Sequence, residues 1–186
     1  MIRSEIKKLV MSIPPLDAME AEQIAFVERW IDSGAEIFRI AKPATPDPHL
    51  VSYFVLIDAV EQKLLLVDHK KANLWLPAGG HVEPNEHPQE TVAREIVEEL
   101  GIDAEFILDQ PFFLTVTPTT GEKGRHTDVS LWYLVKGNAA KTLEYDAEEF
   151  HDIRWFAPDE IPLAKSDPHM RRLIEKLVLH QFIDLR

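Results

Sequence analysis

Residues 79–102 combine a glycine pair with an acidic, helix-forming segment, and this combination restricts the fold more than any other feature of the chain. Pro88 suits the first turn of a helix, and Gly101 suits its C-terminal stop. Apolar residues recur between them at three- and four-residue steps, which predicts an apolar face of Val92, Ala93, Ile96, Val97 and Leu100. The sequence therefore predicts a helix over 88–100, with Glu95, Glu98 and Glu99 together on the opposite face.

Three carboxylates at this spacing repel one another, by roughly 0.2–0.5 kcal/mol for each pair. A solvated helix face is the ordinary explanation of such a run. The alternative is that a hard cation such as Mg²⁺ takes the carboxylate oxygens. Arg94 can offset part of the charge because it precedes Glu98 by four residues, and Gly79 and Gly80 let the backbone approach a ligand closely.

The spacing favours the metal-binding alternative. Seven positions carry the residues that such an arrangement needs: Gly80, Glu86, Arg94, Glu95, Glu98, Glu99 and Gly101. At average amino-acid usage, the chance of this set in one window is on the order of one in a hundred million. Residues 80–102 match the signature of the Nudix hydrolases, and residues 50 to about 160 resemble a Nudix domain in the order of their elements.

This resemblance implies a role for each residue of the signature. The implied metal ligands for Mg²⁺, or Mn²⁺ in its place, are Glu95, Glu98, Glu99 and the Gly80 carbonyl. The implied catalytic residues are Glu95, Glu98 and Arg94, with Glu95 as a ligand or as the base and Arg94 orienting the glutamates. Glu86 and Gly101 would support the helix at its two ends. The base often lies on a loop outside the signature in this family, and Glu122, Glu144, Glu148 and Glu149 are the open alternatives.

Several other polar and aromatic residues have weaker claims. His126, Asp128 and Ser130 fall on one side of a predicted strand, where they face either a pocket or solvent. His81 and His87 are expected at the surface. The aromatic residues that would stack a base or fill the core are Tyr53, Trp75, Phe112, Phe113 and Trp132.

Strands and helices mix without regular alternation, which predicts an α+β or mixed α/β fold. The predicted strands cover 36–40, 51–60, 63–68, 104–108, 112–117, 126–136 and 153–156, with a loop over 119–125. Helices are predicted over 2–13, from a capping box at Asp17 and Glu20 to about residue 33, and from 167 onward. The family resemblance implies an α/β/α sandwich with a mixed sheet in a Nudix domain of residues 50–186. Residues 1–49 would form an N-terminal helical extension, acting as a cap, a dimer contact or a lid.

The composition of the chain limits the classes of partner and substrate that we expect. The net charge of −12 argues against nucleic acid and anionic membranes, so we expect a small nucleotide-type substrate. There is no cysteine, which excludes a thiol nucleophile and a cysteine metal site and fits a cytoplasmic protein. No apolar run approaches the length of a membrane span. The apolar N-terminal helices make a homodimer an open alternative.

The resemblance implies metal-dependent hydrolysis of a pyrophosphate bond in a nucleoside diphosphate linked to another group. The alternative is a nucleotide-sensing module without turnover. Such modules commonly lose residues of the signature, whereas this chain keeps them. A diphosphate isomerase on the same scaffold is disfavoured because that chemistry uses a cysteine.

Overall fold

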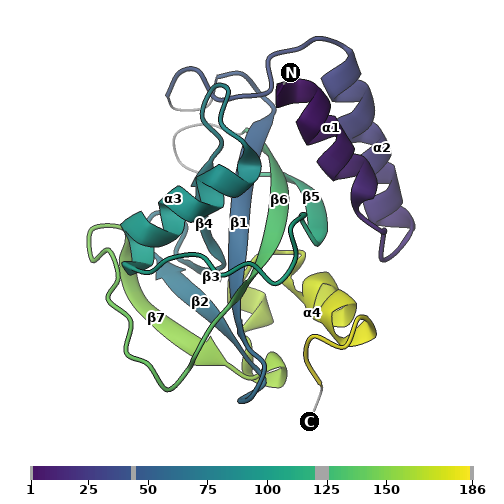
Figure 1. Cartoon of the computed structure of the whole chain (residues 1–186). Coiled ribbons are helices and arrows are strands. Elements are labelled where there is room, and N and C mark those ends of the chain that lie inside the picture. Colours follow the sequence, from purple (N-terminus) through teal and green to yellow (C-terminus); the bar gives the residue numbers. More distant parts are fainter. Residues whose placement is uncertain (1, 43–44, 120–125, 185–186) are drawn as a thin grey trace.

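The computed structural model describes residues 2–42, 45–119 and 126–184. Two helices open the chain, followed by a strand-rich region in which one helix follows the fourth strand and another closes the fold (Figure 1). The helices are α1 (Ile2–Ser12), α2 (Ala18–Asp32), α3 (Pro88–Leu100) and α4 (Met170–Leu179), with short 3₁₀ turns η1 (Pro158–Glu160) and η2 (Leu163–Lys165). The strands are β1 (His49–Asp58), β2 (Lys63–His69), β3 (Leu74–Leu76), β4 (Ala78–His81), β5 (Phe113–Pro118), β6 (Thr127–Lys136) and β7 (Phe150–Phe156).

Strand β1 is the centre of a seven-stranded mixed sheet. It pairs in parallel with β6 along its whole length, from His49 opposite Asp128 to Ile57 opposite Lys136. Its other edge pairs antiparallel with β4 near its start and with β2 near its end. β5 extends the sheet beyond β6, and β3 and β7 flank β2. The start of β1 therefore lies between β4 and β6, which brings their ends together.

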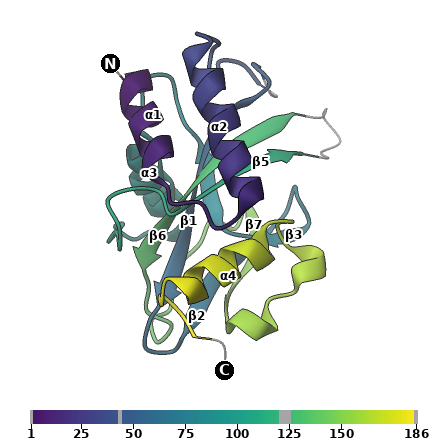
Figure 2. The same cartoon turned by 90° about the vertical axis from the view of Figure 1, so that its right-hand side faces the viewer.

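The two faces of the sheet carry separate hydrophobic cores. Alternate residues of β1 enter opposite cores, with Phe54 and Leu56 in one and Val55 and Ile57 in the other. α3 covers the first core and α4 covers the second, as Figures 1 and 2 show. The predicted α/β/α sandwich with a mixed sheet is confirmed.

The N-terminal helices pack back on the sheet. Ile6 and Val10 of α1, and Val27 of α2, are fully buried in the same core as Phe54. α1 and α2 lie side by side in both views (Figures 1 and 2). Division of the chain at residue 49 into an extension and a domain stays a prediction. Within the described residues, no helix is both long and apolar enough to cross a bilayer.

Two predicted strands are wrong. Residues 36–40 form no strand, because the Glu36 carboxylate accepts the backbone N–H groups of Ile37 and Phe38 instead. Residues 104–108 are irregular apart from an isolated bridge between Phe106 and Val135. The remaining predicted strands and helices are present with ends shifted by a few residues, and 120–125 of the predicted loop lie outside the described residues.

Candidate functional site

Helix α3 begins and ends where the local sequence predicts. Its start is capped in both directions: His87 Nδ1 accepts the N–H of Gln89 at 3.2 Å, and the Glu90 carboxylate accepts the N–H of His87 at 3.1 Å. Its end is Gly101, in the left-handed conformation with φ of +66°, and the Gly101 N–H bonds the Val97 carbonyl. These caps hold the helix in a fixed position on the sheet.

The buried face of α3 differs from the predicted one. Val92, Ile96 and Leu100 pack into the core as expected, but Val97 is half exposed. Glu99, expected on the polar face, is 5% exposed. The reason is that α3 packs against both β4 and β1, so the glutamates next to the apolar stripe meet β4 rather than water.

The glycine pair in β4 allows this close approach. Gly79 has φ of +142°, and a Cβ there would lie 2.2 Å from the Ser52 carbonyl oxygen. A Cβ on Gly80 would lie 2.0 Å from Oε1 of Glu95. The Gly79 N–H donates to Oε2 of Glu99 at 3.0 Å. The Glu95 carboxylate therefore occupies the space that a side chain at Gly80 would fill, and Gly79 lets β4 lie close to the backbone of β1.

Arg94 fixes the neighbouring carboxylates. Its Nε donates to Oε1 of Glu86 at 2.9 Å, and its Nη2 donates to Oε2 at 3.1 Å. Its Nη1 donates to Glu95 at 2.7 Å and lies 3.5 Å from Glu98. Burial opposes ionisation of Glu86, but hydrogen bonds from Arg94, the Glu83 N–H and the Thr91 hydroxyl outweigh it and lower its pKa. The hydrogen bond to Glu86 raises the pKa of Arg94 in turn.

The remaining glutamates carry more negative charge than Arg94 can neutralise. Burial, and then the charges of Glu95 and Glu149, raise the pKa of Glu99 to about 9. Burial also raises the pKa of Glu95 despite its hydrogen bond to Arg94. The Glu98 side chain is 60% exposed at the edge of this group. Carboxylate oxygens on one helix face with a single guanidinium as counter-charge are the kind of donor that a hard divalent cation prefers.

Among the described loop glutamates considered as bases, Glu149 is the one whose charge, after burial, helps to raise the pKa of both Glu95 and Glu99. A hydrogen bond from His69, together with Lys71, lowers the pKa of Glu149 itself. Glu144 lines a depression of about 260 Å³ with Glu98 and Glu99. The other two alternatives are Glu148, which is exposed, and Glu122, which lies outside the described residues.

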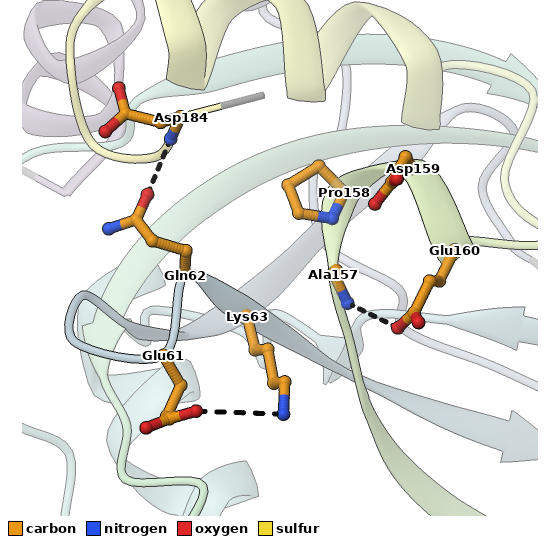
Figure 3. Close-up of a pocket in the computed structure, with 8 residues that line it drawn as sticks. All are labelled: Glu61, Gln62, Lys63, Ala157, Pro158, Asp159, Glu160 and Asp184. Carbon is orange, nitrogen blue, oxygen red and sulfur yellow. Dashed lines mark hydrogen bonds and ion pairs between the residues drawn. The ribbon is translucent and has the colours of Figure 1, made fainter. Parts of the chain in front are cut away.

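Another depression, of about 210 Å³, lies at the turn between β1 and β2 (Figure 3). Its acidic residues outnumber its one lysine: Glu61, Asp159, Glu160, Asp184 and Lys63. Lys63 lies 4.0 Å from Glu61. This acidic lining disfavours a phosphorylated ligand there.

The expected surface position is wrong for His81, whose ring is half-buried in a group of polar residues. His126 and Asp128 belong to the same group, so the polar side of β6 faces other side chains rather than open solvent. His49 completes the group and was missed, because it comes at the end of a proline-rich segment with no motif around it. Ser130, the third residue of the predicted polar side, is buried.

The aromatic residues considered for base stacking divide into two groups. Phe113 and Trp132 are fully buried, and Phe112 is 3% exposed, so all three belong to the core. The Trp132 indole N–H donates to the Thr115 hydroxyl at 2.9 Å within that core. Tyr53 and Trp75 are only partly buried.

Known proteins resemble the chain in sequence and in fold. The family model of the NUDIX domain matches residues 48–177, well over half of the chain. A nucleoside triphosphatase of Escherichia coli is 31% identical over 47% of this chain and 64% of its own length. A Bacillus subtilis protein, provisionally named an 8-oxo-dGTP diphosphatase, is 27% identical over 59% of this chain and 68% of its own length.

Solved structures agree in fold. A NUDIX-family hydrolase from Clostridium perfringens superposes with a TM-score of 0.55 and 22% identity, covering 71% of this chain and 97% of its own. The dihydroneopterin triphosphate pyrophosphohydrolase of E. coli superposes with a TM-score of 0.57 and 16% identity, covering 70% and 95%. With the matched domain, the glycine pair and the glutamate-bearing helix in one place, the chain belongs to the Nudix hydrolase family.

Proposed function

We propose that the chain hydrolyses a pyrophosphate bond in a nucleoside diphosphate linked to another group: a further phosphate, a nucleotide or a sugar. The observation that carries this is the ridge of Glu95, Glu98 and Glu99, packed on the glycine pair and braced by Arg94. The names of the two sequence relatives, a nucleoside triphosphatase and an 8-oxo-dGTP diphosphatase, support a nucleotide substrate.

The donor set fits Mg²⁺, with Mn²⁺ as a substitute, because it consists of carboxylate and carbonyl oxygens. Glu95, Glu98, Glu99 and the Gly80 carbonyl would hold the ion. When bound, the ion would supply positive charge to the phosphate oxygens and lower the pKa of water. Without such a cation the ridge would repel the substrate, since its carboxylates outnumber the guanidinium of Arg94 beside them.

The chain's own residues would position the reactants. Arg94 holds the Glu95 carboxylate toward the glycine pair and keeps Glu86 ionised as its partner. Gly80 leaves the room that the Glu95 carboxylate occupies beside β4. Such positioning and charge neutralisation account for most of the rate enhancement in phosphoryl-transfer enzymes.

Among the described loop carboxylates, Glu149 is the proposed general base toward the attacking water. It is close enough to Glu95 and Glu99 to affect their titration, and its lowered pKa keeps it ionised. Glu95 is the alternative base within the ridge. Substitution of Glu149 by glutamine should therefore remove the acidic limb of the pH–rate profile, whereas Glu148→Gln should leave that limb in place.

The proposal is tested with a panel of nucleoside triphosphates, dinucleotides and nucleotide sugars, assayed for nucleotide and phosphate release with Mg²⁺ or Mn²⁺. At least one compound should be cleaved, and Glu98→Gln should lower turnover at least about 100-fold with the fold intact. Glu90→Gln is the matched control, because it removes the same charge from an exposed position on the same helix. If the chain bound a nucleotide but cleaved no compound of the panel with either metal, the enzyme hypothesis would be rejected in favour of the nucleotide-sensing module.

A further inference from the structure

Three strand ends bring four potential metal ligands together, and none of the four is a glutamate of α3. His49 begins β1, His81 ends β4, and Asp128 lies in β6 two residues after His126. One ligand atom from each of the four residues lies within 4.8 Å of the others. The sheet register brings these residues together. His49 of β1 is paired with Asp128 of β6, and Val51, two residues further along β1, is paired with His81 of β4.

The separations within this His–Asp group fit a tetrahedral metal site. His49 Nε2 lies 3.4 Å from Asp128 Oδ1, and His126 Nε2 lies 3.2 Å from the same oxygen. A tetrahedral zinc ion with ligands at 2.0–2.2 Å places its ligand atoms about 3.4 Å apart. The two separations to Asp128 Oδ1 agree with this value to about 0.2 Å.

A hydrogen bond assigns the ring nitrogens of His49, and a second contact restricts those of His126. His49 Nδ1 lies 2.7 Å from the Pro46 carbonyl, which only accepts, so Nδ1 carries the proton and a neutral ring leaves Nε2 bare. The Thr119 hydroxyl lies 2.9 Å from His126 Nδ1 and 3.2 Å from the His126 carbonyl, and when it donates to the carbonyl it accepts from Nδ1, which leaves His126 Nε2 without a proton. The same outer bonds orient the histidine ligands of known metal sites.

In this tautomer arrangement three acceptors lie close together, because the Nε2 atoms of His49 and His126 are 3.4 and 3.2 Å from Asp128 Oδ1. His49 is fully buried, and neither its Nε2 nor Asp128 Oδ1 has a hydrogen-bond partner among the described residues. Buried lone pairs in this arrangement repel one another unless a cation lies between them.

We propose that His49, His81, His126 and Asp128 bind a zinc-class transition-metal ion at a site distinct from the Mg²⁺ ridge of α3. Imidazole nitrogens select zinc, copper or nickel, whereas Mg²⁺ prefers oxygen ligands and keeps its waters. Four protein ligands make a closed site, which is typical of structural zinc. The ion would tie the starts of β1 and β6 to the end of β4, beside the glycine pair.

Substitution of Arg39 tests whether the His–Asp group binds a cation or an anion. Its Nη1 lies 3.3 Å from His81 Nε2, so it donates to that nitrogen and competes with a metal for it. Arg39→Ala should therefore tighten metal binding about tenfold, by removing both the competitor and a nearby positive charge. If the group bound an anion instead, the same substitution would weaken binding.

The experiment titrates Co²⁺ into the chelator-treated full chain in excess Mg²⁺, which occupies the carboxylate ridge but does not compete for imidazole. Visible absorption of Co²⁺ reports tetrahedral coordination directly and independently of turnover. We expect one tetrahedral Co²⁺ per chain, displaced by Zn²⁺. His126→Asn and Asp128→Asn should each weaken binding by at least about 100-fold, more than the loss of an outer-shell partner costs.

The control is His151→Asn, which removes an exposed histidine on β7 and should leave the spectrum unchanged. Zn²⁺ should also raise the Tm of the wild-type chain and of Arg39→Ala, and not that of Asp128→Asn. Absence of tetrahedral Co²⁺ in both the wild-type chain and Arg39→Ala, or an unchanged spectrum in His126→Asn and Asp128→Asn, would overturn the proposal.

Discussion

Lys176 of α4 and Glu20 of α2 form an ion pair in which both side chains are fully buried. The ammonium lies 2.8 and 3.0 Å from the two carboxylate oxygens. The carboxylate also accepts the backbone N–H groups of Leu16 at 2.6 Å and Leu114 at 3.1 Å. The N-terminal helices are thus joined to the rest of the chain through a charge that has no access to water.

Replacing Lys176 with methionine keeps most of the side-chain volume but leaves the Glu20 carboxylate buried with only two backbone donors. Removing one partner of a buried pair typically costs about 3–5 kcal/mol. Domains of this size are stabilised by only about 5–15 kcal/mol, so the loss should be large. The double variant Glu20→Gln with Lys176→Met should be less destabilised than the sum of the two single variants, with a coupling energy of about 1–3 kcal/mol.

Urea unfolding followed by far-ultraviolet circular dichroism measures these changes as shifts of the midpoint at constant slope. Lys7→Met is the matched control, because Lys7 pairs with Glu28 and Asp32 at the protein surface. Its midpoint should move far less than that of Lys176→Met. Equal shifts for the two lysine variants, or additive effects in the double variant, would refute the argument that burial makes this pair indispensable.

Three other predictions follow from the site and its surroundings. Gly80→Ala should keep the fold but lower turnover at least about tenfold, because the new methyl group displaces only the Glu95 carboxylate. Gly79→Ala should instead lower the urea midpoint, because its Cβ would meet the backbone of β1 at a strained φ. Arg94→Lys should weaken Mg²⁺ binding about 10- to 100-fold in calorimetry, since a lysine cannot keep the paired bonds of the guanidinium. The hydrogen bond from Arg172 lowers the pKa of Asp17 to about 2. The ionised carboxylate therefore stabilises the fold at pH values above its usual pKa, and this contribution is lost as the pH falls through about 2. Asp17→Asn should flatten the acid limb of a curve of stability against pH.

The local features of the site were predictable. The span of α3, its glycine C-cap, the turn between β1 and β2, and the pairing of Arg94 with Glu98 all depend on residues a few positions apart. Helix periodicity and capping chemistry act over the same short range. The family resemblance added the sandwich and the mixed sheet, which no local pattern contains.

Burial was predicted less well than helix position. The α3 pattern placed Val97 with the apolar residues and Glu99 with the polar ones, yet the structure exposes the first and buries the second. Glu20 was predicted to cap α2, and Asp17 does accept the Glu20 N–H, but the Glu20 carboxylate instead forms the buried pair with Lys176. In both cases the packing of another helix or strand decided which side chain was buried, and the local sequence pattern carries no information on that neighbour.

By itself, the sequence determined where the glutamates of α3 stand relative to one another, because 3.6 residues per turn set their spacing within one helix. It also determined that two glycines precede this helix. The tertiary structure alone decided that Glu149 approaches the ridge and that His49, His81 and His126 converge on Asp128. These groups come from strands far apart in the chain, and their distances depend on strand pairing and register, which are set by the packing of the whole sheet.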